Sequence, residues 1–555
     1  MAALHMRQGF PWLAVLWLAF LCALGLRLVP LWENPPFSPD SWSYWELAQT
    51  VGGDFYRIHT WRQFQFTEPW GVSFPPLWPL AIAAADALTG LGFRSALALN
   101  AAIMIALAAL LQAFGTRFLE PRGSAGHGGM LGLLVALALV AHRSAFEELS
   151  AGRSMPLSLL LYLLLLWQLL AAARAGQSGT PARMALRAAA LGATAALATL
   201  NRFDFLPALL LLGLVAPWWL LREHGRWGAS MVAWWAAAGA TLAPWITYCV
   251  SHFGRPFVSD NSRTVLAAVR VNVDDFLVQP PPTLFDLPAH WLAKTAQGIA
   301  TAAASLAQPL AVNLLLLALF ALLLLRWRDR QRTVVGGTGP ASPPTDPLWR
   351  GWWLADLAVA AQLGAVLLTG FTSIRYALAL ELHLLLRLGA AVLTSGLPGN
   401  AALGDAAPAA RARAMHTRVL PSMLALLASA VALQFALLFA PPLQRWLAPP
   451  ADATPLHTHA ALAACLRAQA TPRVLFLTDD NTHAYRFGAL YGIETLGTPH
   501  NHRTAELDVL VRRFAATHVY VEQARPVDGG LAQRLGATLM PVCGRTDVYR
   551  IALAK

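Results

Sequence analysis

Apolar runs about as long as a membrane is thick recur along this chain, and they limit its fold more than any other feature. A helix needs about 20 apolar residues to cross the hydrocarbon layer. Eleven runs approach this length, at roughly 11–31, 94–115, 129–142, 156–173, 186–200, 206–221, 228–249, 300–325, 351–370, 377–394 and 419–440. The pattern predicts a polytopic α-helical membrane protein, because a membrane β-barrel would show alternating segments of about ten residues.

The composition excludes the main alternatives to a membrane protein. Charged residues make up 13% of the sequence and hydrophobic residues 57%, whereas soluble proteins carry about 25% charged residues. A soluble multidomain enzyme is therefore excluded, and so is an intrinsically disordered chain. A single anchor is excluded because the apolar runs continue from residue 11 to residue 440.

The basic residues predict how the chain is oriented. Of the 41 basic residues 39 are arginines, and the net charge is +12. With the N-terminus in the cytoplasm, the cytoplasmic segments carry sixteen arginines and five acids, as the positive-inside rule requires. Eleven spans then place the C-terminus outside a bacterial-type inner (plasma) membrane. The first run is interpreted as a spanning helix, because it is too long for a signal peptide and no small-residue cleavage site follows it.

We expect two units in this chain. Residues 1–440 would form a transmembrane catalytic domain with large outside loops at 32–93 and 250–299, and residues 441–555 a small soluble α/β domain outside the cytoplasm. Within the second unit the pattern predicts a helix and three strands, at 505–516, 474–477, 518–521 and 548–551. Cys465 and Cys543 lie in this unit and either pair in an oxidising compartment or stay apart.

The first outside loop carries the residues of greatest chemical interest. Prolines end the first span and start a short amphipathic helix over 41–51. Asp40, Tyr44 and Ala48 share one face of this helix, while Trp42 and Trp45 suit the membrane–water boundary. We expect the helix to lie along the outer membrane surface and to hold Asp40 at the mouth of the bundle.

Two further features of this loop bear on Asp40. Asp40 has a second interpretation as the N-cap of its helix, a position that aspartate favours. After the turn Gly52-Gly53-Asp54, the double proline Pro75-Pro76 starts another short helix, over about 76–90. This helix is too short for a full span and is expected on the outer surface as well.

The order of these features resembles the GT-C class of glycosyltransferases. The chain is similar to the group that contains protein O-mannosyltransferases and lipid A aminoarabinose transferases. An aspartate follows the first span, a tyrosine stands four residues later, and a Gly-Asp turn precedes a Pro-Pro-Leu helix. Asn201-Arg202-Phe203-Asp204 and Arg375-Tyr376 add later similarities. The resemblance covers residues 11–440.

The resemblance implies a sugar donor linked to polyprenyl phosphate, with Asp40 as the catalytic base. The chain departs from the family at two places. Phe74 stands where related proteins often have a lysine that contacts the lipid phosphate. Some related proteins also carry an acid in the second outside loop, where the next span begins. Residues 152–156 at this position contain no acid, and Glu147 and Glu148 stand too early in the sequence to match it. These departures leave the donor and any role of a metal open.

Sugar transfer from a lipid phosphate asks for few groups. A carboxylate takes the proton of the attacking acceptor, cations stabilise the departing phosphate, and an apolar groove holds the lipid. The candidate phosphate ligands are Arg57, Arg62, Arg153, Arg202 and Arg375. The candidates for shaping the acceptor site are Tyr44, Asp54, His59, Glu68, Asp204 and Tyr376. Each arginine has an alternative role at the interface or in an ion pair, such as Arg202 with Asp204.

No cofactor or metal ligand is assigned from the sequence. The histidines at 483, 500 and 502 show no zinc-site spacing, so a divalent metal stays open without a motif to support it. A glycine-rich phosphate loop is missing, which argues against a nucleotide-sugar donor. The expected partners are the lipid-linked donor, membrane lipid, and a lipid, glycan or protein acceptor, without nucleic acid.

Three other functions compete with an inverting glycosyltransferase. A lipid-linked sugar flippase or transporter would show inverted repeats and mid-membrane polar residues. We find no repeat between the halves of the sequence, and the acids are expected near helix ends. A polysaccharide polymerase or ligase would use arginines such as Arg255, Arg263 and Arg270 in the large outside loop. A non-catalytic scaffold would bind a partner through the C-terminal domain.

Overall fold

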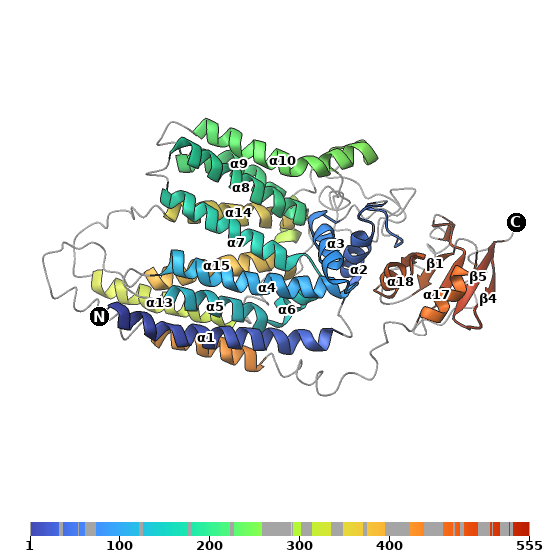
Figure 1. The fold of residues 1–555 in the computed structure, drawn as a ribbon, viewed down its shortest axis with the longest axis horizontal. Helices are drawn as coiled ribbons and strands as arrows, with labels where there is room; N and C mark the ends of the chain where they lie inside the picture. Colours follow the sequence, from blue (N-terminus) through green and yellow to red (C-terminus); the bar gives the residue numbers. More distant parts are fainter. Residues whose placement is uncertain are drawn as a thin grey trace.

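The described part of the chain is a long helical bundle with a small mixed domain at one end (Figure 1). In the computed structural model the described residues are 2–32, 37–53, 55–60, 74–120, 126–175, 180–221, 227–257, 290, 292–300, 313–334, 348–369, 374–394, 422–437, 459–469, 472–477, 482–497, 511–512, 514–521, 532 and 537–553. The expected boundary between the two units, at residue 440, lies outside them.

The bundle consists of helices that lie over each of the expected spans. They are α1 (Ala2–Leu28), α4 (Arg94–Phe114), α5 (His127–Ala141), α7 (Met155–Ala175), α8 (Pro181–Asn201), α9 (Leu206–Leu221), α10 (Trp227–Phe253), α13 (Leu314–Val334), α14 (Leu348–Thr369), α15 (Ile374–Thr394) and the helix Ser422–Leu437. Four described stretches are long and apolar enough to cross a membrane, Pro11–Leu28, Arg94–Leu119, Met155–Ala175 and Pro181–Asn201. The chain is a multi-pass membrane protein, and the number of eleven spans stays a prediction.

Helix α5 is enclosed by neighbouring helices of the bundle. Its side chains from Leu131 to Ala141 are all buried, which is the pattern of a helix surrounded by other helices. It packs closely against the π-helix η2 (Gly115–Leu119), where a Cβ on Gly115 would overlap with the backbone of Gly128. This burial explains how so short an apolar run fits within the bundle.

Ionisable side chains also lie well inside the bundle, so the expectation that acids stand near helix ends is wrong. Asp356 belongs to α14, and Glu381 and His383 belong to α15, seven to nine residues from the nearer helix end. His383 Nε2 lies 2.6 Å from Asp356 Oδ1, and His383 Nδ1 lies 2.5 Å from the Tyr162 hydroxyl. Glu381 is fully buried and accepts a hydrogen bond from Asn313.

Short helices gather at the end of the bundle opposite the N-terminus (Figure 1). They are the 3₁₀ turns η1 (Val29–Leu31) and η3 (Phe203–Phe205) and the helices α2 (Pro39–Gln49), α3 (Leu77–Thr89) and α6 (Arg143–Ser150). Helix α3 ends at Gly90, which adopts the left-handed conformation with φ +64°. Asp86 then fastens the turn to α4 by accepting hydrogen bonds from Gly92 N at 2.7 Å and Ser95 Oγ at 2.8 Å.

The C-terminal domain is an α/β unit beside α2 and α3 (Figure 1). Its elements are α17 (Ala460–Arg467), β1 (Arg473–Leu477), α18 (Thr482–Tyr491), β2 (Glu494–Gly497), β3 (His518–Val521), β4 (Ala537–Pro541) and β5 (Val548–Leu553). The strand order is β2-β1-β3-β5-β4, with β1 parallel to β2 and β3, and β5 antiparallel to its neighbours. The three expected strands are confirmed as β1, β3 and β5. Most of the expected helix 505–516 lies outside the described residues.

A disulfide between Cys465 and Cys543 joins α17 to the turn between β4 and β5. It resolves the alternative that the sequence left open. The two cysteines are 78 residues apart in the sequence. The bond therefore ties the first helix of the domain to its last two strands. Of the other cysteines, Cys249 is buried and Cys22 lies exposed on the surface of α1.

Candidate active site at the end of the bundle opposite the N-terminus

Helix α2 begins with a capping box that positions Asp40 in its first turn. Ser38 is the N-cap, because its Oγ accepts from Ser41 N at 3.4 Å and its own N donates to Ser41 Oγ at 3.2 Å. The interpretation of Asp40 as the N-cap is therefore wrong. Asp40 is the second residue of the helix and is partly exposed, so its carboxylate stands where the helix begins and where the N-terminal dipole favours an anion.

The rest of α2 is packed inside the protein. Trp42 and Trp45 are buried, so the expectation that they lie at the membrane–water boundary is wrong. Tyr44, one turn after Asp40, lies with its ring centroid 4.7 Å from that of Phe74 and its hydroxyl 3.4 Å from Ser154 Oγ. Phe74 thus fills apolar space at the position where the related proteins carry a lysine. The core around α2 fixes the direction in which Asp40 emerges.

Arg153 meets the start of α2 from the turn between α6 and α7. Gly152 in this turn has φ +70°, and a Cβ there would stand 2.9 Å from the ring of Phe37, so the turn requires glycine. Arg153 Nε donates to Ser38 Oγ at 3.1 Å. The arginine is therefore hydrogen-bonded to the residue that caps the turn bearing Asp40.

Glu148 is a site residue that the sequence analysis set aside. It pairs with Arg153 Nη1 and is only 8% exposed, and its Oε2 has no hydrogen-bond partner among the described residues. An acid thus reaches this turn from α6, although the family's register would place it in the following span. In the sequence, the one sign of this ion pair is that Glu148 stands five residues before Arg153, with the turn residue Gly152 between them.

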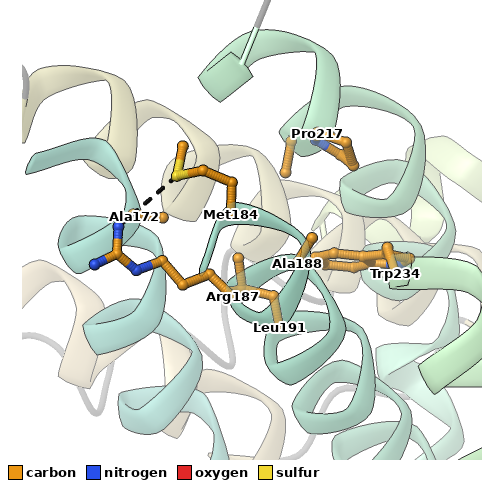
Figure 2. Close-up of a pocket in the computed structure, with 8 residues that line it drawn as sticks. Ala172, Met184, Arg187, Ala188, Leu191, Pro217 and Trp234 are labelled. Atoms are coloured by element: carbon orange, nitrogen blue, oxygen red, sulfur yellow. Dashed lines mark hydrogen bonds between the residues drawn. The ribbon is translucent and has the colours of Figure 1, made fainter. Parts of the chain in front are cut away.

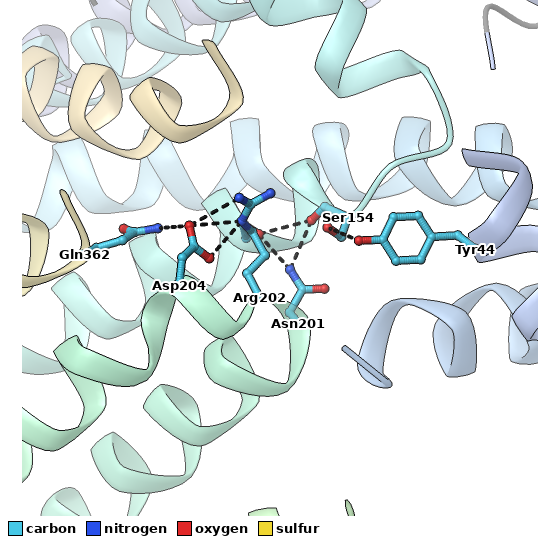
Figure 3. Close-up of polar contacts among 7 residues, drawn as sticks. Tyr44, Ser154, Asn201, Arg202, Asp204 and Gln362 are labelled. Carbon is cyan, nitrogen blue, oxygen red and sulfur yellow. Dashed lines mark hydrogen bonds and ion pairs between the residues drawn. The ribbon is translucent and has the colours of Figure 1, made fainter. Parts of the chain in front are cut away.

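A chain of polar contacts continues from Tyr44 into the bundle (Figure 3). Asn201 Nδ2 donates to Ser154 O at 3.1 Å and to Ser158 Oγ at 2.7 Å. The next residue, Arg202, forms an ion pair with Asp204 at 3.1 Å, and Asp204 also accepts from Gln362 Nε2 of α14 at 3.2 Å.

The ion-pair alternative for Arg202 is thus confirmed as a contact. Through Asp204 the pair connects η3 to α14, and Ser154 and Asn201 link it to Tyr44 of α2. To bind phosphate, Arg202 would have to contact the phosphate and Asp204 at the same time.

His59 lies on the other side of α2, where the first loop touches the C-terminal domain. Glu46 is 3% exposed and accepts from both the backbone N and Nδ1 of His59, the latter at 2.8 Å. The hydrogen bond to Glu46 raises the pKa of His59, against a smaller opposing effect of burial. Thr495 N donates to His59 O at 3.0 Å, and Thr60 forms a parallel bridge with Thr495. The loop therefore extends the sheet at the β2 edge.

The remaining predicted site residues lie apart from these contacts or outside the described residues. Arg57 is exposed on the loop before His59. Asp54, Arg62 and Glu68 lie outside the described residues. Arg375 and Tyr376 stand in the first turn of α15, and their side chains are outside the described part. Among the residues that the structure does describe, no group of three or more His, Cys, Asp or Glu side chains is arranged to hold a metal ion.

An apolar pocket lies elsewhere in the bundle, between α7, α8, α9 and α10 (Figure 2). Its cavity volume is about 20 Å³, and it is lined mainly by Ala172, Met184, Leu191, Pro217 and Trp234, with Arg187 at its edge. Arg187 is near the start of α8, whereas Asn201 ends it. The two are separated by about 21 Å at the helical rise of 1.5 Å per residue, so this pocket is distinct from the Asp40 site.

Comparison with known proteins identifies the fold. No protein-family model matches the sequence, and no curated protein matches it. The structure of an Archaeoglobus fulgidus oligosaccharyltransferase in complex with zinc and sulfate is similar over 97% of this chain and 73% of that chain, with a TM-score of 0.53 and 12% identity.

Two further solved structures show weaker similarity. ArnT from Cupriavidus metallidurans bound to undecaprenyl phosphate covers 96% of this chain and 97% of its own, with a TM-score of 0.48 and 13% identity. The oligosaccharyltransferase AglB from Archaeoglobus fulgidus, with an inhibitory peptide and a dolichol phosphate, covers 92% and 69%, with a TM-score of 0.47 and 12% identity. The resemblance predicted from the first loop is confirmed at the level of architecture, and the chain has the fold of the GT-C class of membrane glycosyltransferases.

Proposed function

We propose that this protein is a glycosyltransferase that moves a hexosyl or pentosyl group from a polyprenyl-phosphate donor to an acceptor at the outer face of the membrane. One observation carries the proposal. A partly exposed aspartate, Asp40, stands in the first turn of a capped helix, and Arg153 is hydrogen-bonded to the cap of that turn. An acid and a cation thus belong to neighbouring turns at the end of an apolar bundle. The oligosaccharyltransferase that shares the fold supports a transferase.

The chemistry needs one proton acceptor and one stabilised leaving group. Asp40 takes the proton from an acceptor hydroxyl or amine as the acceptor oxygen or nitrogen attacks the anomeric carbon. The bond from that carbon to the phosphate oxygen breaks, and its electron pair leaves with the polyprenyl phosphate. A single displacement inverts the anomeric configuration. Because phosphate is a weak base, no second acid has to protonate it, unlike in glycoside hydrolysis.

Arg153 is the best-placed described cation for the departing phosphate. Its partner Glu148 neutralises much of its charge, so the guanidinium must serve the carboxylate and the phosphate at once, as a fork of five donors permits. Arg57 is exposed on the same loop and adds a second candidate. Arg62, Arg202 and Arg375 complete the proposed set.

The disulfide supports an outer placement of the C-terminal domain. Disulfides persist in oxidising compartments such as the periplasm and are rare in the cytosol. The N-terminus and the C-terminal domain stand at opposite ends of the bundle (Figure 1), which agrees with a cytoplasmic N-terminus. We propose an inner-membrane protein of this orientation, whose acceptor is a lipid, a glycan or a protein of the cell envelope.

The test is the variant Asp40→Asn, assayed in membranes with a panel of polyprenyl-phosphate sugars. Loss of a general base lowers turnover by about 10²- to 10⁴-fold. Asp86→Asn is the matched control, since Asp86 fastens the α3–α4 turn on the same outer end. It should lower thermal stability and keep turnover. Unchanged turnover in a folded Asp40→Asn protein would remove Asp40 as the base.

The ionisable contacts inside the bundle favour a second candidate, a lipid-linked sugar flippase. Asp356, His383 and Tyr162 form a continuous contact across α14, α15 and α7, and intramembrane ionisable residues commonly mark transport pathways. Lipid translocation in proteoliposomes, without any glycosyl product from the same panel of donors, would support this candidate and contradict the transferase.

A further inference from the structure

Basic side chains gather where the parallel strands of the C-terminal domain end. His483 and Arg486 stand in the first turns of α18, which follows β1. Arg545 belongs to the turn between β4 and β5, and His459 precedes α17. The ring of His459 lies 5.6 Å from that of Tyr520 in β3 and 6.5 Å from that of His483, and the guanidinium of Arg545 lies 5.9 Å from the Tyr520 ring. Ligands of α/β domains commonly bind at this edge of the sheet.

His459 gives a second, independent indication of a ligand. His459 is only 5% exposed, and its Nδ1 has no hydrogen-bond partner among the described residues. Buried polar atoms in native proteins nearly always have a partner, and leaving one unsatisfied costs about 1–3 kcal/mol. An orphaned nitrogen at the strand edge is therefore the kind of group that a bound molecule would satisfy.

The charge around His459 favours an anion over a metal ion. Burial first, and then the charges of Arg486, His483 and Arg545, lower the pKa of His459 to about 4. Asp547 is the one acid among the described groups that act on it, and it is already bound by Arg545 at 2.7 and 2.6 Å. The described groups around His459 would therefore repel a cation and attract an anion.

We propose that this cluster is a binding site for a tetrahedral oxyanion of the phosphate class. Arg486 and His483 would supply charge-assisted hydrogen bonds, and His459 would donate from its orphaned Nδ1. The anion comes either from free phosphate or from a phosphorylated sugar. The proposal does not depend on the role of Asp40, since the site belongs to the C-terminal domain alone.

The experiment measures the thermal stability of the full-length protein in detergent as inorganic phosphate or glucose 6-phosphate is added at constant ionic strength. We expect a saturable rise, because a ligand that binds only the folded state stabilises it by mass action. A stronger effect of glucose 6-phosphate would identify a phosphorylated sugar as the ligand, and equal effects would identify phosphate itself.

Substitutions locate the anion. Arg486→Gln and His483→Gln should each weaken binding by about tenfold or more, the loss expected for one charge-assisted hydrogen bond. Arg473→Gln is the matched control, because Arg473 starts β1 at the opposite edge and pairs with Glu494 at 2.7 Å. Equal binding in all variants would overturn the proposal. So would a wild-type protein that phosphate does not stabilise, or one that zinc stabilises in its place.

Discussion

The carboxylates at the end of the bundle opposite the N-terminus differ in what they contact. Asp86 fastens a turn, Glu46 holds His59, and Asp204 joins Arg202 to Gln362. Glu148 is buried against Arg153. Asp40 stands in the first turn of a capped helix and is partly exposed, as Asp86 and Asp204 also are. The proposal that Asp40 is the base rests on its place in this turn and on the resemblance of the first loop.

The pair of Glu148 and Arg153 gives a prediction at this scale. Arg153→Met leaves Glu148 as a buried carboxylate without its cation, and removing one partner of such a pair costs about 3 kcal/mol. The double variant Arg153→Met/Glu148→Leu should recover most of this loss, because an apolar pair is often as stable as a buried ion pair. Thermal unfolding of the purified proteins checks the prediction. Equal losses in the single and double variants would contradict it.

Helix α18 links the C-terminal domain to the proposed catalytic loop. Its residues Tyr485 and Ala489 share a buried apolar cluster with Trp45 of α2, while Gly488 faces Thr60 and Thr495. The same short helix carries His483 and Arg486 of the proposed anion site. One element therefore lies between the two proposed sites, and displacement of this helix would alter both.

Gly488→Ala tests this contact. A Cβ at Gly488 would overlap with Thr60 Oγ1 and stand 2.9 Å from Thr495 Oγ1, so the helix has to move away from the loop. We expect faster amide hydrogen exchange over residues 55–60. Gly239→Ala in α10 is the control, because a Cβ there meets nothing within 4 Å, and alanine is favoured over glycine in helices. Unchanged protection of residues 55–60 in Gly488→Ala would count against the contact.

At the scale of the whole molecule, two histidines make different parts of the structure depend on pH in opposite directions. Glu46 raises the pKa of His59 above its usual 6.5. The stabilisation from protonated His59 is therefore complete below pH 6.5 and is lost as the pH rises through the folded-state pKa. The pKa of His459 is instead lowered to about 4. The unfolded domain binds that proton first, so stability falls as the pH drops from about 6.5 towards 4.

We therefore expect the contact between the loop and the C-terminal domain to weaken above neutral pH, and the C-terminal domain itself to weaken in acid. Hydrogen exchange over 55–60 and 459–467 at several pH values, corrected for intrinsic rates, separates the two effects. Glu46→Gln should remove the alkaline change alone, and His459→Phe the acidic change alone. A single transition shared by both segments would show that these histidines are not responsible.

Much of the fold was predictable because its signals are local. Apolar runs predict helices wherever they reach membrane length, and the capped Pro-rich start of α2 follows from prolines and serines within a few residues of Asp40. Strands β1, β3 and β5 were predictable from their apolar and β-branched residues. The short strands β2 and β4 were missed, since Glu494–Gly497 and Ala537–Pro541 lack such a pattern.

The sequence by itself determined that this protein is a membrane helix bundle with Asp40 at the start of a short helix after the first span. Only the tertiary structure decided that Glu148 serves Arg153, that Cys465 bonds to Cys543, and that Asp356 and His383 meet inside the bundle. The physical reason is the range of the interactions. Helix formation and capping depend on neighbours a few residues away, whereas ion pairs and disulfides join residues whose proximity is created by packing.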